Sequence, residues 1–373
     1  MTTYITIKDV IDSAKKNGND NVLVWDPTVF RDNKQKNKNT KMDCTWIPIK
    51  LKLANGTEAP LKIKFAKVVT ASGAKLPSSE NDDPKNMIIV FRTMTHEEIL
   101  TGDYAPKKMS SDAEQIIEDK KAQDAADMML SSTNEFNQAM EIIDLSYQKV
   151  CQELKDAQSL GFTIRKDKKV KSNEDINVYS IRQISREDKE TPGADDIKLE
   201  FPLTRIKLLL KDGKVGIETW NNTSKGFDFR PNVFDSRKMT AKNNYAPVLA
   251  TVKENGKLCA LDSKNSSVFI TYKSVVGGII EFPEIVVSKF GLSFANKFKE
   301  LYVKRNKSNL TESAFSKEDF QSLGTAENES DDDVEMPVLK MEEKFSKVKI
   351  TEVSDLEDNI SGSDLEDACE ESE

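Results

Sequence analysis

The sequence has few of the residues that most enzymes use for acid–base and metal chemistry. His96 is the only histidine, and the four cysteines, Cys44, Cys151, Cys259 and Cys369, are scattered without a CxxC spacing. Most histidine-based catalytic arrangements are therefore excluded, and neither a zinc site nor a disulfide framework is expected. The GxxxxGK[ST], GxGxxG, GxSxG and HExxH motifs are also missing. We expect a protein that is not an enzyme and that needs no metal or other cofactor.

Long apolar runs are lacking as well. No stretch of about 18 apolar residues occurs, so no segment is expected to span a bilayer. The opening MTTYITIKDVIDSAKK has no apolar core followed by a small-residue cleavage site, so secretion is not expected. Scattered cysteines fit a reducing compartment. These absences together predict an intracellular protein without a membrane partner.

Acidic charge is concentrated at one end of the chain. The whole sequence has 63 acidic residues against 55 lysines and arginines, a net charge of −8. Residues 321–373 hold 18 of the acidic residues and 4 of the lysines, which leaves 45 acidic and 51 basic residues elsewhere. A body with a net charge of +6 therefore precedes a tail with a net charge of −14. This asymmetry suggests nucleic-acid binding or an interaction tail.

The hydrophobic periodicity predicts an α+β protein. Strand-like segments with Asn-Gly or Asp-Gly turns lie on both sides of a helical segment at about 110–160. Regular βαβ alternation is absent, which favours an OB-like antiparallel β-barrel with an inserted helical segment over a doubly wound sheet. Residues 1–305 are assigned to this body. Ser, Glu and Asp dominate residues 306–373, for which we predict a disordered acidic tail.

The helical segment carries an apolar stripe with intervals of four and three residues. This spacing predicts one buried helix face, which packs on the core or on a partner helix. Ser131, Ser132 and Thr133 are candidates for the residue that caps its start. The stripe consists of Phe136, Met140, Ile143, Tyr147, Val150 and Leu154.

The segment WIPIKLKLANGTEAPLKIKF, residues 46–65, is predicted to form one β-hairpin around Asn55-Gly56. Its apolar residues alternate with lysines, and no acid interrupts the lysines before Glu58 in the turn. One interpretation is an ordinary solvated strand face. The other is a phosphate-binding face made of Lys50, Lys52, Lys62 and Lys64, with Trp46 as a stacking partner.

Two further segments combine cations with aromatic residues. In FPLTRIKLLLKDGKVGIETW, Arg205 and Lys207 share one face of a predicted strand and are candidates for phosphate contact. Residues 221–244 are predicted to form a long loop. Around and within it, Trp220, Phe227, Phe229 and Phe234 interleave with Lys225, Arg230, Arg237 and Lys238. Stacking of bases on Trp220, Phe227 and Phe229 is one interpretation, and anchoring of the loop on the core is the other.

The acidic tail contains a near-repeat, SDLED, that begins at Ser354 and again at Ser363. These serines and Ser330 precede acidic residues and are candidate phosphorylation sites. Such a tail can compete with nucleic acid for a basic groove, recruit basic partners, or only keep the protein in solution.

Several segments together resemble the single-stranded DNA-binding proteins of large cytoplasmic DNA viruses, the family of the African swine fever virus protein. The similar segments are MTTYITIKDVIDSA, EAPLKIKF, TRIKLLL and GGIIEFPEIVVSKFGLSF, in order over roughly residues 1–300, together with the helical insert. The sequence departs from the family in its longer 221–244 segment and its acidic tail. The resemblance implies an OB-like barrel that coats single-stranded DNA during viral replication in the host cytoplasm, and it leaves packaging in the virion open.

Two functions from different classes follow. The first is a single-stranded DNA-binding protein that acts in replication, repair or recombination and meets replication proteins through its tail. The second is a non-enzymatic scaffold whose acidic tail recruits basic partners. A preference for DNA over RNA, and the oligomeric state, do not follow from the sequence.

Overall fold

The structure is a computed structural model of the whole chain. It describes residues 4–26, 29, 31–32, 45–76, 84–101, 104–156, 176–186, 196–221, 223–254, 256–288 and 291–305. The predicted tail at 306–373 lies outside the described residues. Within the described part, many strands and a few helices alternate irregularly along the chain, which confirms the α+β class.

One long helix and several short ones are present in the described residues. They are α1 (Ile7–Asn17), α2 (His96–Ile99), α3 (Asp112–Asp156), α4 (Ser266–Phe269) and the 3-10 turns η3 (Ser236–Lys238) and η4 (Ala241–Asn243). A capping box begins α1, because Thr6 accepts from the Asp9 backbone N–H while the Asp9 carboxylate accepts from that of Thr6. Gly18 follows α1 with a positive φ of 94°, a conformation that glycine adopts without strain.

A five-stranded sheet forms the centre of the molecule. Its order is β1 (Ile5–Thr6), β6 (Lys62–Val69), β17 (Val275–Glu281), β20 (Lys297–Lys304) and β14 (Val233–Asp235). The pairs β6–β17 and β17–β20 are antiparallel, whereas the outer strands β1 and β14 run parallel to their neighbours.

A second, seven-stranded sheet lies beside it. Its main order is β2 (Leu23–Trp25), β4 (Thr45–Lys52), β18 (Glu284–Ser288), β19 (Gly291–Phe294) and β8 (Val178–Tyr179), and β3 (Arg31–Asp32) and β5 (Glu58–Pro60) also pair with β4. Pro283 separates β17 from β18, so the chain passes from one sheet directly into the other.

A third sheet is built on β10, the longest strand among the described residues. Its strands are β11 (Lys214–Val215), β10 (Ile197–Lys211), β7 (Asn86–Phe91) and β9 (Arg182–Arg186). The predicted Asp212-Gly213 turn joins β10 to β11, and both residues have a positive φ, 50° and 73°. This conformation is the one that the tightest hairpin turns require.

Two separate hairpins complete the architecture, β12–β13 (Ile217–Asn221 and Gly226–Arg230) and β15–β16 (Thr251–Glu254 and Lys257–Ala260). The strands of the described residues are therefore divided among five sheets and do not close into one barrel. The OB-like barrel predicted from the hairpin pattern is therefore not confirmed. That pattern indicates which neighbouring strands pair but not which strands join the pairs to one another.

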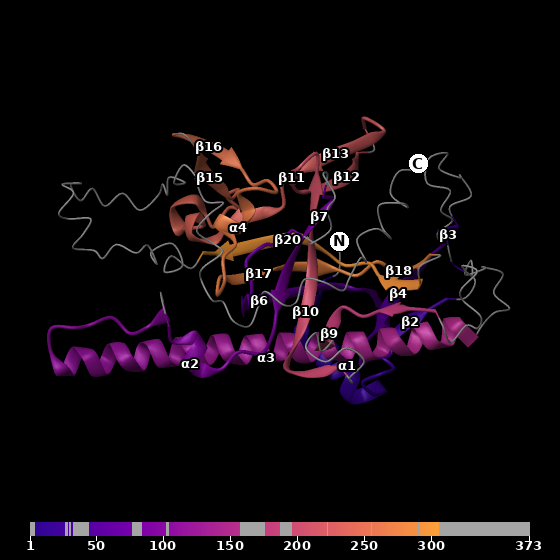
Figure 1. Cartoon of the computed structure of the whole chain (residues 1–373), viewed down its shortest axis with the longest axis horizontal. Helices are drawn as coiled ribbons and strands as arrows, with labels where there is room; N and C mark the ends of the chain where they lie inside the picture. Colours follow the sequence, from indigo (N-terminus) through magenta and orange to yellow (C-terminus); the bar gives the residue numbers. More distant parts are fainter. Residues whose placement is uncertain are drawn as a thin grey trace.

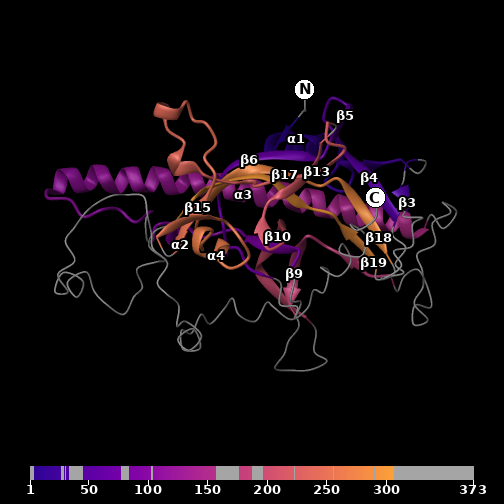
Figure 2. The ribbon, with the colours of Figure 1, turned by 90° about the horizontal axis from the view of Figure 1, so that it is seen from above.

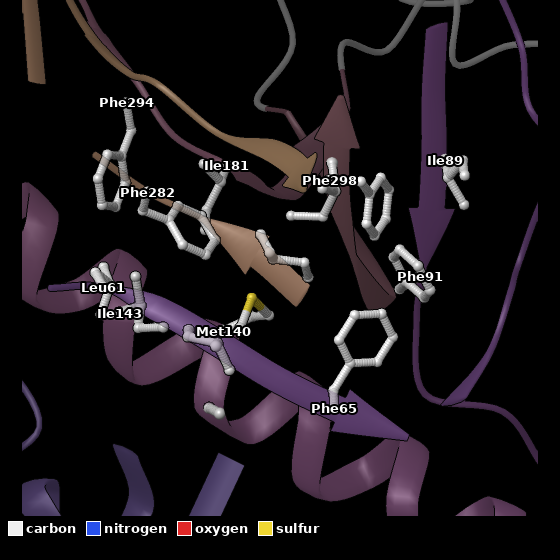
Figure 3. Packing of buried hydrophobic residues seen from close by; sticks show 14 of the residues in the cluster. Leu61, Phe65, Ile89, Phe91, Met140, Ile143, Ile181, Phe282, Phe294 and Phe298 are labelled. Atoms are coloured by element: carbon white, nitrogen blue, oxygen red, sulfur yellow. The ribbon is translucent and has the colours of Figure 1, made fainter. Parts of the chain in front are cut away.

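Helix α3 runs along one side of the sheets (Figure 1). Every residue of its predicted apolar stripe is buried, and Phe136 lies 5.2 Å from Phe65 and 4.9 Å from Phe91 between ring centroids. Figure 3 shows Met140 and Ile143 of the helix facing Leu61, Phe65 and the phenylalanines of the sheets. The stripe therefore packs on the core of this chain.

The N-terminal part of α3 extends past the sheets, as Figures 1 and 2 both show. No residue between 112 and 125 is buried, and the first buried one is Ala126. A start near Ser131 was therefore wrong, because the helix begins at Asp112, about five turns before Ser131.

Candidate nucleic-acid interface

The segment 46–65 does not form one hairpin. Asn55-Gly56 joins β4 to the short strand β5, with Leu51 opposite Ala59. After Leu61 the chain enters β6, which belongs to the five-stranded sheet and pairs with β1 and β17. The four lysines are consequently divided between two sheets and do not form the face of a single hairpin, although their alternation with buried apolar residues is confirmed.

Two of these lysines are paired with acids. Lys50 Nζ lies 3.1 Å from a carboxylate oxygen of Glu58, and Lys62 Nζ lies 2.8 Å from one of Glu281. Glu281 comes from β17, directly across the sheet from Lys62. Lys52 and Lys64 are exposed. Exposed lysines remain able to bind a phosphate, whereas a paired lysine must first give up its carboxylate.

The remaining predicted residues of the first two segments are partly buried. Trp46 is half-buried on β4, between Arg31 of β3 and Val286 of β18 in the register of the sheet. Arg205 is half-buried on β10 and donates from Nη2 to the side-chain oxygen of Gln183. Burial lowers the pKa of Arg205. Lys207 is half-buried on the same face of β10. Because these side chains are partly buried, each has less surface available for contact with a nucleic acid than the sequence predicts.

Residues 221–244 are not the long loop that the sequence predicts. Their first part is the β12–β13 hairpin, in which Trp220 lies directly opposite Phe227. Both side chains are more than half exposed, at 53% and 55%. Their ring centroids are 5.2 Å apart and the planes meet at 74°, an edge-to-face pair. In Figure 1 this hairpin projects on the side of the sheets opposite α3.

The turn of this hairpin is held by hydrogen bonds from its own polar residues. Asn221 Oδ1 accepts from the backbone N–H groups of Thr223 (2.9 Å) and Ser224 (3.3 Å), while its Nδ2 donates to Asp228. Lys225 is exposed and adopts a positive φ of 49° before Gly226. The aromatic pair is therefore presented by an ordered turn, and Asp228 has a structural role besides its charge.

Phe229 and Arg230 lie at the base of the same hairpin. The ring of Phe229 packs on Gly216, where an added Cβ would lie 2.5 Å from two ring atoms. The Phe229 ring is thus partly covered and the side chain is only half-exposed, so Phe229 is a weaker stacking candidate than Phe227. Arg230 is exposed and alternates with Phe229 along β13, so it points to the other face of the hairpin.

Arg237 and Lys238 form part of η3. Arg237 binds Asp235 through two hydrogen bonds, from Nε (3.0 Å) and from Nη2 (2.8 Å), and Lys238 is half-buried. Asp235 is itself buried. The predicted free cation at Arg237 is therefore one partner of an ion pair.

Phe234 and Tyr302 form an aromatic pair that the stacking predictions left out. They are opposite each other on β14 and β20, with centroids 5.1 Å apart and planes at 23°. Burial, followed by the Glu300 carboxylate that accepts from its hydroxyl, raises the pKa of Tyr302 to about 12. The sequence KELYVKR, residues 299–305, contains a signal that could have identified Tyr302 as a candidate. Strand alternation places Tyr302 and Lys304 on the same face, so an aromatic ring and a cation lie side by side.

The proposed phosphorylation sites Ser330, Ser354 and Ser363 lie outside the described residues. Within the described ranges, no three His, Cys, Asp or Glu residues converge as a metal site would require. No helix in that part of the chain combines the length and apolarity needed to cross a membrane. No protein-family model and no curated protein matches the sequence.

Proposed function

We propose that the protein binds single-stranded DNA and catalyses no reaction. The observation that carries this proposal is the Trp220–Phe227 pair, two large rings exposed on one face of an ordered, projecting hairpin. Unstacked bases cover such rings, and each stacked base contributes about 1–3 kcal/mol. An exposed cation that can follow the phosphates lies in the turn of the same hairpin at Lys225, whereas Arg230 is exposed on the other face.

The viral resemblance supports the same proposal in finer detail. It adds an OB-like relationship among the strands, coating of the strand during replication, repair or recombination, and the host cytoplasm as the place of action. The net positive charge of the body favours association with any polyanion. The aromatic pair is what favours a single strand, because the bases of a duplex are already stacked.

The test is the double variant Trp220→Ala, Phe227→Ala in the full chain. We expect its affinity for a labelled oligothymidylate to fall at least about tenfold, because two stacking surfaces are lost together. Fluorescence anisotropy at low salt gives the affinity. Leu258→Ala is the matched control, since Leu258 is 62% exposed on the other separate hairpin. Equal affinity of the double variant and the control would refute the role of the pair.

A scaffold function is the second candidate, and the exposed part of α3 favours it. Ile116 and Ile117 are 69% and 68% exposed there, on a stretch with five acidic residues and two lysines whose net negative charge suits a basic protein partner. Removing residues 307–373 separates the two candidates. DNA binding becomes stronger if the tail competes with DNA, whereas capture of a basic partner is lost if the tail recruits it.

A further inference from the structure

Three charged side chains meet where β14 and β20 end side by side. Asp235 is the last residue of β14, opposite Val303 in the parallel register, and Arg305 follows β20 directly. Arg237 comes from η3, which begins after Asp235. Asp235 and Arg305 are both buried, with 2% and 7% of their surfaces exposed. This group is called the Arg305 cluster below.

The only carboxylate of this cluster, that of Asp235, is bound by Arg237. Its Nε and Nη2 form one edge of the guanidinium and bind the two oxygens of Asp235 side by side. The Asp235 Oδ1 atom also accepts from the Arg237 backbone N–H at 3.1 Å. Asp235 is therefore committed to Arg237, in the two-bond geometry that an arginine edge forms with a carboxylate or a phosphate.

The corresponding edge of Arg305 has no hydrogen-bond partner among the described residues. Its Nε and Nη2 are buried and make no hydrogen bond with any residue of the described part of the chain. Burial, followed by the positive charge of Arg237, lowers the pKa of Arg305 to about 10, while Asp235 opposes that shift. A buried guanidinium edge without an acceptor is an unfavourable arrangement unless an anion completes it.

We propose that the unpartnered edge of Arg305 is an oxyanion site that binds one phosphate of the nucleic acid. This inference rests on the proposed function and extends it to a specific phosphate contact. Two oxygens of a phosphate match Nε and Nη2, as the oxygens of Asp235 match those of Arg237. The cluster and its neighbour Lys238 hold three cations and one carboxylate, so positive charge remains to be neutralised.

The Arg305 cluster lies on the face of β14 and β20 that also carries Val303. The Phe234–Tyr302 pair and the exposed Lys304 lie on the opposite face of the same two strands, so the cluster can hold a phosphate but these rings do not stack on its nucleotide. Since both nitrogens of the Arg305 edge are covered, a phosphate enters only when this edge opens. β14 is hydrogen-bonded on both sides, to β20 and to the backbone of Val248 and Ala250, so the part of this edge that opens is η3, a single turn packed on β20.

The first experiment uses inorganic phosphate as the probe and needs no DNA. Thermal unfolding of the full chain is followed with increasing phosphate, against chloride at equal ionic strength. We expect phosphate to raise the melting temperature of the wild type in a saturable way. Arg305→Met should abolish this increase and, without phosphate, should unfold at the same or a higher temperature, because an unpaired buried charge is removed.

Arg182→Met is the matched control. Arg182 is also an arginine with a buried, unpartnered Nε, but its Nη1 lies 3.4 Å from a Glu141 oxygen. We expect this variant to lose stability and to keep the phosphate-dependent increase. If Arg305→Met instead lowers the melting temperature without phosphate while the phosphate effect persists, Arg305 is structural and the proposal is overturned.

The second experiment measures affinity for a labelled oligonucleotide. Arg305→Met should weaken binding about tenfold or more, and Arg305→Lys, which keeps the charge but not the edge, should recover only part of that loss. Unchanged affinity in Arg305→Met overturns the phosphate contact. If no wild-type binding occurs but phosphate still stabilises through Arg305, the oxyanion site stands and the proposed function fails.

The chain's own acids are the competing source of an oxyanion. The variant Glu312→Gln, Glu318→Gln, Asp319→Asn in the full chain tests this source, since these are the first acidic residues after Arg305. The proposal expects the same phosphate effect in this variant as in the wild type. A phosphate effect that appears only in the variant would identify a carboxylate of the chain as the ligand and overturn the proposal.

Discussion

At the scale of single residues, Asp144 shows how a buried charge fixes the position of a helix. It lies on the buried face of α3 with 3% of its surface exposed. Its oxygens accept from the Ser180 hydroxyl (2.7 Å), the Ile181 backbone N–H (3.1 Å) and Gln148 Nε2 (2.8 Å). Two of these donors belong to the segment that enters β9, so the carboxylate joins α3 to a strand.

Asp144 should make stability depend on pH. Burial raises its pKa although the hydrogen bonds from Ser180, Gln148 and Ile181 oppose this increase. At a pH between the pKa of Asp144 in the unfolded chain, about 3.9, and its raised pKa in the folded protein, the folded state keeps this proton and the unfolded state loses it. Its contribution to the free energy of unfolding is largest below that window and falls as pH rises through it. The fall is about 1.4 kcal/mol for each pH unit that separates the folded and unfolded pKa values.

Urea unfolding of the wild type and of Asp144→Asn from pH 3.5 to 7 measures this effect. The asparagine does not titrate, so the lost acceptor gives a constant offset between the two proteins. We expect the stability of the wild type relative to the variant to decrease with rising pH. A difference that is independent of pH would show that Asp144 titrates at the same pH in the folded and unfolded states.

Single residues also show where sequence reasoning stops. The strand alternation around Lys62 is visible in the sequence, but its partner Glu281 is more than 200 positions away. The edge-to-face pair of Trp220 and Phe227 depends on a turn whose polar residues looked like loop. An exposed aromatic pair breaks the usual alternation of buried apolar and exposed polar residues, which is why the hairpin was missed.

At the scale of elements, α3 has two halves in different environments. Residues 136–154 carry the buried stripe, whereas residues 112–125 pack on no part of the sheets. Local contacts steady the exposed half, such as the hydrogen bonds of Gln115 with the Met109 N–H and the Lys107 carbonyl oxygen. Isolated helices shorter than about 12–15 residues are marginal in water.

Hydrogen exchange should therefore divide the helix. We expect the amides of residues 113–125 to exchange at least about a hundredfold faster than those of residues 136–150, because opening the first set exposes little apolar surface. Mass spectrometry of exchanged peptides gives both rates in one sample, and the buried half is the internal control. Equal protection in both halves would mean that another surface covers the exposed half in solution.

The elements were easier to predict than their partners. α1, the β10–β11 turn and the apolar stripe of α3 depend on contacts within a few residues, and the sequence indicates all three. The chain leaves β5 and enters β6 at Leu61, and this step depends on contacts with β17. Phe282, the residue after β17, donates its backbone N–H to the Leu61 carbonyl oxygen at 2.9 Å. Such long-range pairing leaves no local periodicity, so one hairpin was predicted where two sheets meet.

At the scale of the whole molecule, binding to a polyanion depends on which lysines are already paired. Lys50 and Lys62 have carboxylate partners, whereas Lys52 and Lys64 are exposed. Each phosphate contact on a single strand contributes about 0.7 to the slope of log affinity against log salt. We expect Lys52→Gln, Lys64→Gln to reduce that slope by about 1.4 and Lys50→Gln, Lys62→Gln to reduce it less.

Both double variants remove the same charge, so each controls for the other. Oligonucleotide titrations at four or more salt concentrations give the slopes, and thermal unfolding shows that both variants are folded. Equal slopes for the two variants would mean that only the net charge of the body matters and that the ion pairs do not hold these lysines.

The exposed half of α3 has a consequence for the arrangement of several copies on one strand. Fourteen residues of helix, 112–125, form a rod about 21 Å long that reaches past the sheets. Under the proposed function, a rod that points along the bound strand would meet the neighbouring copy before the sheets of the two copies touch. A fully loaded strand would then keep stretches of bare nucleotides between copies, which a footprint larger than the contact surface would show.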